Sequence, residues 1–183
     1  ATAEQFSAKG YKVGFLSCTE MVNGHKDPYS QVLRCYDDQA IIESLVQKNK
    51  GQIMIITPHW GEENTGTPNK AQKNFARRMA EIGVTAIIGN HPHVLQPLEW
   101  LTTSDGRRVL IAYSLGNFLA WQKGTEKKAS VILYLEFDAS GTLVSHYYRP
   151  TWRGGNWVKP YTAAEFGPEP LAYIKKMLGP SPK

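Results

Sequence analysis

Three of the five histidines in this chain closely follow two short apolar runs. His59 comes after residues 52–57, and His91 and His93 come after residues 84–89. Because ligands of open α/β sheets bind outside the carboxyl ends of the strands, such positions are typical of functional side chains. Neutral imidazole is also the commonest protein ligand for metal ions. The pattern therefore predicts a metal or phosphate site at one edge of a sheet.

The spacing of His91 and His93 favours convergence of their rings. In an extended stretch, side chains at positions i and i+2 point to the same side, so both rings can meet one ion or two neighbouring ions. Gly89, directly before this segment, permits a sharp turn or a close approach of the backbone. The alternative is that the histidines are structural groups whose hydrogen bonds are satisfied within the fold.

Carboxylates and amides lie close to these histidines in the sequence. Glu62 and Glu63 follow His59, and either one can ligate a metal, orient an imidazole or act as a catalytic base. The alternative for each is a solvated loop carboxylate. Asn117 follows a third predicted strand, where its amide either helps catalysis by binding and orienting a phosphate or caps a turn.

Three further residues are candidates for contact with a substrate. Asn90 and Ser114 lie next to the motif residues, and Ser114 has no adjacent base in the sequence that would make it a nucleophile. Trp60 either lines the cleft or packs in the core.

The elements that must position these residues follow from the apolar periodicity. The first 89 residues read as strand, helix, strand, helix, strand, which predicts a parallel sheet with right-handed crossovers. Turn signals at residues 104–106 and 139–141 predict antiparallel hairpins in the second half. The predicted strands cover residues 11–18, 52–57, 84–89, 94–101, 107–113, 130–138 and 142–149, and the predicted helices run from Asp37 or Asp38 to Gly51, from Thr67-Pro68 to Gly83, and over 169–178.

Composition narrows the class of protein. The chain has 183 residues, 42% of them apolar, which suits one domain with a substantial core. Its net charge of +5 indicates either an ordinary basic surface or a polyanionic partner, and the scattered cations do not favour nucleic acid. The two cysteines form no disulfide framework; Cys18 is expected as a buried thiol, and a single bridge to Cys35 is the alternative.

Three motifs occur in order along the chain: His59-Trp60-Gly61-Glu62-Glu63, then Gly89-Asn90-His91-Pro92-His93, then Tyr113-Ser114-Leu115-Gly116-Asn117. Together they resemble the CapA family of poly-γ-glutamate capsule biosynthesis proteins, over roughly residues 11–121. That family is similar to calcineurin-like metallophosphoesterases. The resemblance implies part of a four-layer α/β/β/α sandwich with a two-metal site.

The resemblance also implies roles for individual residues. His59, His91 and His93 match metal ligands, and the implied cofactors are divalent ions, namely Mn, Zn, Fe or Mg. The early Gly-Asp and Asn-Asn-His motifs of full-length members do not occur here, so residues 1–183 read as the C-terminal portion of one such domain, with 151–183 as a peripheral extension. No aspartate stands at a predicted strand end near the motifs. We therefore expect an incomplete metal site that the N-terminal half or a second chain completes.

Three functions compete. The first is a metal-dependent phosphoesterase-type hydrolase, in which a metal polarises a phosphoryl oxygen during the synthesis or export of an anionic capsule polymer. The second is a non-catalytic, polyanion-binding component of a capsule assembly complex. The third is a structural remnant whose histidines are satisfied core groups. The resemblance implies other capsule synthesis proteins as partners and a cell-surface location, with a membrane anchor in the parent protein.

Overall fold

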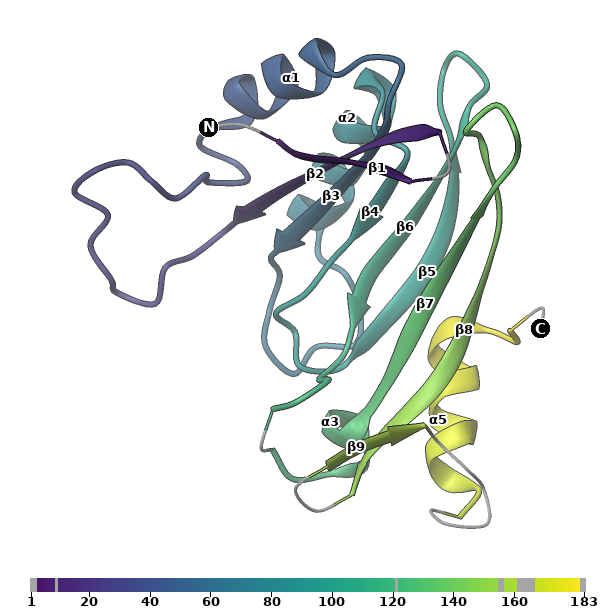
Figure 1. Cartoon of the computed structure of the whole chain (residues 1–183). Coiled ribbons are helices and arrows are strands. Elements are labelled where there is room, and N and C mark those ends of the chain that lie inside the picture. The colour runs from purple at the N-terminus through teal and green to yellow at the C-terminus, as the bar shows by residue number, and fades with distance from the viewer. Residues whose placement is uncertain (1–2, 9, 121, 155–156, 161–166, 182–183) are drawn as a thin grey trace.

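A six-stranded sheet forms the centre of the molecule (Figure 1). The computed structural model describes residues 3–8, 10–120, 122–154, 157–160 and 167–181. The strand order is β1-β2-β3-β4-β6-β5, and β2, β3 and β4 are parallel, as predicted. Strand β6 also runs parallel to β4, which was not predicted from the sequence. The antiparallel strands β1 and β5 form the two edges, and β1 was not predicted. The strands are β1 (Glu4–Ala8), β2 (Tyr11–Thr19), β3 (Ile53–His59), β4 (Ala86–Ile88), β5 (Leu95–Thr102) and β6 (Arg108–Leu115).

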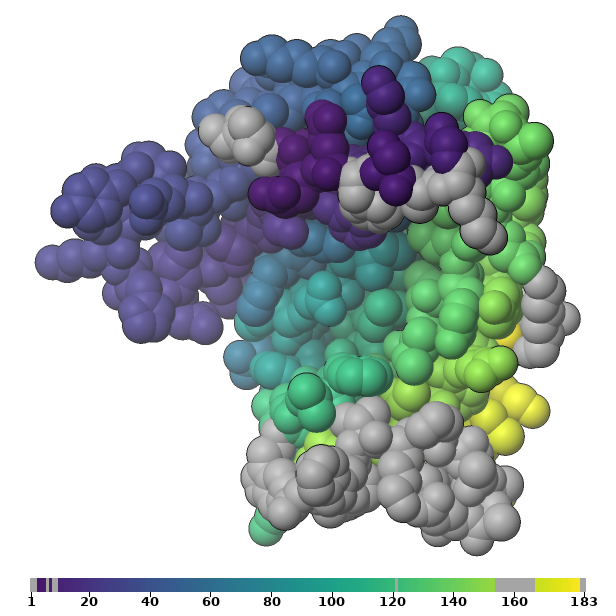
Figure 2. All heavy atoms as spheres, in the orientation of Figure 1, coloured from purple at the N-terminus to yellow at the C-terminus, as the bar shows by residue number. Residues whose placement is uncertain are grey.

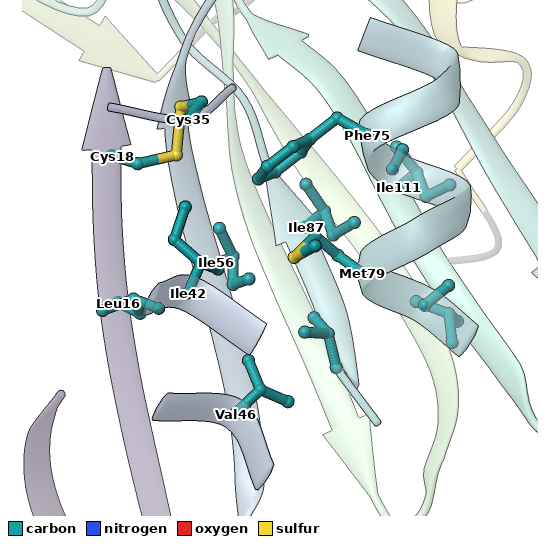
Figure 3. Packing of buried hydrophobic residues seen from close by; sticks show 14 of the residues in the cluster. Leu16, Cys18, Cys35, Ile42, Val46, Ile56, Phe75, Met79, Ile87 and Ile111 are labelled. Carbon is teal, nitrogen blue, oxygen red and sulfur yellow. A yellow bond between two sulfur atoms is a disulfide. The ribbon is translucent and has the colours of Figure 1, made fainter. Parts of the chain in front are cut away.

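Both faces of this sheet are covered, which explains the unbroken apolar run in β3. Helices α1 (Gln39–Lys48) and α2 (Lys70–Ile82) pack on one face. Figure 3 shows the side chains of this layer, including Leu16 and Ile56 from the sheet and Ile42 and Met79 from the helices. On the other face Ile55 and its neighbours contact the second sheet.

Helix α2 begins later than the sequence predicts. Its N-cap is Asn69, whose side chain accepts a hydrogen bond from the backbone nitrogen of Gln72 at 2.9 Å. The Gln72 Oε1 atom in turn accepts from the Asn69 nitrogen at 2.9 Å. This reciprocal capping box satisfies two helix-terminal donors, so Pro68 lies outside the helix and not at its first position.

The second half of the chain adds an antiparallel sheet, as its turn signals predict. The order is β7-β8-β9, and α5 packs against β5, β7 and β8 (Figure 1). The two sheets and the helices α1 and α2 therefore supply three of the four layers that the resemblance implies. Within the predicted extension 151–183, residues 155–156, 161–166 and 182–183 lie outside the described residues. The elements are α3 (Thr125–Lys128), β7 (Ala129–Phe137), β8 (Leu143–Gly154), β9 (Trp157–Pro160) and α5 (Glu169–Leu178).

The segment between β2 and α1 projects from the body of the molecule (Figure 2). A disulfide joins Cys18 to Cys35, with 5.0 Å between the Cα atoms, so the expected buried thiol is wrong and the alternative bridge is present. Figure 3 shows this bond beside the core. Backbone hydrogen bonds from Thr19 to Leu33 and from Cys35 to Thr19, both 2.9 Å, hold the returning segment against the end of β2. Among the described residues, no helix combines the length and the apolar character needed to cross a membrane.

Candidate functional site

Four parallel strands end at one edge of the first sheet, and the candidate residues lie there. Thr19 at the end of β2 is the register partner of His59 at the end of β3. The pairing of β3 with β4 continues past the end of β4, because Trp60 donates to the carbonyl of Asn90 at 3.0 Å and Asn90 donates to that of Pro58 at 2.9 Å. This backbone pairing brings the two histidine loops side by side.

The three predicted imidazoles converge at this edge. The Nε2 atom of His59 lies 2.7 Å from Nδ1 of His91, and the centroids of the two rings are 4.5 Å apart. The ring of His93 lies 6.0 Å from that of His91. The expected extended geometry is wrong, because the φ angles of His91 and His93 are 103° and 63°. Positive φ angles at two histidines so close in sequence are uncommon, and such positions cluster at functional sites.

His93 is oriented by a buried amide. Its Nδ1 atom lies 2.8 Å from Oδ1 of Asn117. The Nδ2 atom of Asn117 donates to Oε1 of Gln122 and to the carbonyl of Lys127, so Oδ1 is the atom left to accept a hydrogen bond from His93. This assigns the proton to Nδ1 and leaves Nε2 with a lone pair, 3.9 Å from Oε1 of Glu63. Asn117 is buried, with 6% of its surface exposed, so its geometry suits an orienting group.

Burial lowers the pKa of two of the imidazoles. It is the main cause that lowers the pKa of His59, and the charges of His91 and His93 lower that pKa further. Burial also lowers the pKa of His91, and the carboxylates of Glu63 and Glu20 oppose this only in part. Neutral imidazole is the form that ligates metal ions.

The loop that follows His59 is joined to the His91–His93 loop. The backbone nitrogen of Asn64 donates to the carbonyl of Pro92 at 2.7 Å. Both candidate carboxylates in this loop are exposed to solvent, and Oε1 of Glu63 lies 3.9 Å from Nε2 of His93. The sequence could not distinguish these two neighbours, because both lie in the same polar loop.

Two hydrogen-bonded glutamine side chains support this loop from the interior of the protein. Gln72 and Gln96 are fully buried, and Nε2 of Gln72 donates to Oε1 of Gln96 at 2.9 Å. The Nε2 atom of Gln96 donates to the carbonyl of Thr65 at 2.8 Å. A buried amide that lost its hydrogen-bond partner would lower the stability of the fold, so these two side chains fix the position of the loop.

Two predicted substrate contacts lie in the core. Trp60 is fully buried, and its Nε1 atom donates to the carbonyl of Tyr113 at 2.9 Å. Only 1% of Ser114 is exposed, and its hydroxyl accepts from the nitrogen of Gly116 at 3.3 Å. Neither side chain reaches the surface at which a ligand would bind, so we drop both from the candidate site. Asn90, by contrast, is exposed at the sheet edge.

Glu20 is a site residue that the motifs did not indicate. It directly follows β2, and its backbone nitrogen donates to the carbonyl of His59 at 2.8 Å. Its Oε2 atom accepts from the backbone nitrogen of Gly61 at 2.7 Å. The available signal was a glutamate two residues beyond the end of the predicted strand 11–18.

The positions of His59 and His91 suit two ligands of a metal ion, and further ligands would be needed to complete its coordination. At a metal–nitrogen distance of about 2.0–2.1 Å and a tetrahedral angle, two ligand nitrogens lie roughly 3.3 Å apart. The nitrogens of His59 and His91 are 2.7 Å apart, so a small separation of the rings would give a ligating pair. In the part of the chain that the structure describes, no three side chains of His, Cys, Asp or Glu are arranged around one ion position.

Comparison with known proteins agrees with the motifs. The model of the family described as "Bacterial capsule synthesis protein PGA_cap" matches residues 2–122. The chain is 36% identical over 95 residues to the PGA biosynthesis protein CapA of Bacillus subtilis (strain 168), a match that covers 52% of this chain and 24% of that protein. It is 33% identical over 98 residues to the capsule biosynthesis protein CapA of Bacillus anthracis, covering 54% and 23%. The chain thus spans about a quarter of the length of these curated relatives.

A solved structure shares the fold. The sulfate thiohydrolase SoxB of Thermus thermophilus, in complex with glycerol, superposes with a TM-score of 0.51 over 96% of this chain and 28% of that one, at 16% sequence identity. At this identity the likeness concerns the fold alone. Together with the sheet topology, it confirms the predicted mixed α/β class with a parallel sheet.

Proposed function

The chain belongs to the bacterial capsule synthesis protein family PGA_cap, and we propose that it carries the histidine half of a divalent-metal phosphoesterase site used in capsule biosynthesis. The single observation that carries this proposal is the convergence of His59, His91 and His93 from two loops at the carboxyl edge of a parallel sheet. In such sheets ligands bind at that edge.

The residues have distinct tasks in this proposal. His59, His91 and His93 would hold a divalent ion, which supplies Lewis-acid polarisation of a phosphoryl oxygen when it is bound. Asn117 Oδ1 accepts a hydrogen bond from Nδ1 of His93, and this orients Nε2 of the ring towards the site. Glu63, whose Oε1 atom is 3.9 Å from Nε2 of His93, would take up a proton or orient the imidazole.

The remaining ligands and the substrate come from outside this chain in our proposal. The N-terminal part of a longer protein, or a second chain, would add the carboxylates and amides that a two-metal site requires. The substrate would be a phosphoester or an anionic polymer such as poly-γ-glutamate, handled together with other capsule synthesis proteins. We also propose a cell-surface location, which the Cys18–Cys35 bridge supports because disulfides persist in oxidising surroundings.

The test uses the longer protein that contains this chain. After loading with Mn²⁺ or Zn²⁺ and removal of free ions, we expect bound metal by mass spectrometry and cleavage of bis(p-nitrophenyl) phosphate. His91→Ala and His93→Ala should each lose at least tenfold in both measurements. His25→Ala is the matched control, because His25 lies exposed in the projecting segment. A protein that holds no ion, and whose His91 and His93 variants keep their activity, would contradict the proposal.

A second candidate is a non-catalytic component that binds a polyanion, which the net charge of +5 favours. Electrostatic capture weakens as salt rises, because exposed charges are screened within a Debye length of about 8 Å at physiological ionic strength. Retention of poly-γ-glutamate that falls steeply with salt and is unchanged in His91→Ala would support this candidate over the phosphoesterase.

A further inference from the structure

We infer that Glu20 is a positioning residue that fixes the turn carrying His59. Two hydrogen bonds bracket this turn, one on each side of Trp60. The backbone nitrogen of Glu20 donates to the carbonyl of His59 at 2.8 Å, and the carboxylate oxygen Oε2 of Glu20 accepts from the nitrogen of Gly61 at 2.7 Å. A single residue at the end of β2 thus holds the chain immediately before and after the bend.

The bond to Gly61 is the stronger constraint of the two. It is charge-assisted, and hydrogen bonds to a carboxylate are roughly twice as strong as neutral ones. Gly61 is buried and has a φ of 85°, so its N–H has little access to water in place of the carboxylate. Removal of the Glu20 side chain would leave this donor without its partner.

Packing leaves the turn no alternative position. A Cβ atom on Gly61 would lie 2.7 Å from the amide of Gln72, so the backbone already rests directly on that buried side chain. Trp60, between the two bracketed residues, is anchored in the core through the carbonyl of Tyr113. The Glu20 carboxylate adds the bond to the Gly61 nitrogen, and we infer that these contacts together hold the His59 ring next to His91.

The first test reads the hydrogen bond directly by amide hydrogen exchange of Gly61, measured by NMR on the present chain. We expect a slowly exchanging amide in the wild type and in Glu20→Gln, whose side-chain oxygen can still accept. In Glu20→Ala exchange should be at least tenfold faster. Asp37→Ala is the matched control, because Asp37 is an exposed carboxylate in the same inter-element segment. Equal exchange in the wild type and Glu20→Ala would overturn the inference, as would a Gln variant that exchanges like the Ala variant.

The second test rests on the proposed function and uses the longer protein. Loss of a residue that orients a metal ligand typically weakens metal binding 10- to 100-fold. We expect Zn²⁺ affinity to fall by about that factor in Glu20→Ala and to stay within about threefold of the wild type in Glu20→Gln. Unchanged affinity in Glu20→Ala would also overturn the inference. If the wild type binds no Zn²⁺, the proposed function fails, whereas the exchange experiment still decides the role of Glu20.

Discussion

The Nε2 atom of His59 and the Nδ1 atom of His91 lie 2.7 Å apart, although 31 residues separate them in the chain. The contact arises because the pairing of β3 with β4 continues through the backbone of Trp60 and Asn90, beyond the last residue of β4. Sheet pairing, rather than loop flexibility, therefore sets the distance between the two imidazoles. Substitutions that disturb the strand ends should affect the site even where they touch neither ring.

Asn117 should matter for both stability and metal binding. Asn117→Ala removes the acceptor for His93 and the donor to the carbonyl of Lys127. Because these groups are largely buried, we expect a loss of about 1–3 kcal/mol in the free energy of unfolding, measured with urea. Metal affinity of the longer protein should fall about 10- to 100-fold. The control is Asn90→Ala, an exposed side chain whose removal should change stability by no more than about 0.5 kcal/mol.

Gly89 should tolerate no side chain. A Cβ atom there would lie 2.1 Å from the carbonyl oxygen of Tyr113 and 2.3 Å from Nε1 of Trp60, both held in the core. Because neither can move aside, we expect Gly89→Ala to lower the free energy of unfolding by about 3 kcal/mol or more. Gly66→Ala is the comparison, since its nearest neighbour is the flexible end of Met177 at 3.1 Å. Equal free energies of unfolding for Gly89→Ala and Gly66→Ala would contradict the close contact at Gly89.

The disulfide should contribute measurably to stability. Cys18 and Cys35 are 17 residues apart, and closing a loop of about this length stabilises a protein by about 3 kcal/mol in the chain-entropy description. The double variant Cys18→Ser, Cys35→Ser should unfold at correspondingly lower urea concentration. Adding dithiothreitol should lower the stability of the wild type and leave the double variant unchanged. A wild type that is insensitive to reductant, with a mass that shows two free thiols, would refute the bridge.

The ion pair between Glu43 of α1 and Arg78 of α2 predicts that the free energy of unfolding depends on pH in the acid range. Two hydrogen bonds from Arg78, with a further one from Gln39, lower the pKa of the Glu43 carboxyl from 4.5 to about 2. Because the unfolded chain binds this proton more tightly, the pair stabilises the fold above about pH 4.5, and the contribution is lost as the pH falls towards about 2.

The effect should be small, because partly exposed ion pairs contribute up to about 1 kcal/mol. We expect wild type and Glu43→Gln to differ most in the free energy of unfolding near neutral pH. The difference should disappear as the pH falls from about 4.5 to about 2. A difference that stays constant down to about pH 2 would argue against the pair.

Much of the fold follows from local sequence signals. The apolar run at residues 52–57 is long enough and apolar enough to identify a strand buried on both faces, and β3 occupies that place. The turn signals at 104–106 and 139–141 identify the two hairpins because glycine accepts the left-handed φ of 82° found at both Gly106 and Gly141. Three histidines at strand ends then imply proximity, since parallel strands end at the same edge.

The finer features of the site depend on contacts that local patterns do not encode. The sequence leaves Trp60 either in the cleft or in the core, and its contacts with Gly89 and Tyr113 place the indole in the core. The backbone of His91 has a φ of 103°, which no local sequence rule indicates. Glu20 reaches Gly61 across 41 positions of sequence. Each of these results from tertiary packing between segments that are distant in the chain.

The hydrogen bond from the Asn64 nitrogen to the Pro92 carbonyl has a mechanical consequence. The segment that bears Glu63 and the one that bears His93 cannot be displaced independently without breaking it. A displacement of the backbone at Glu63 is thereby coupled to a displacement of the backbone at His93.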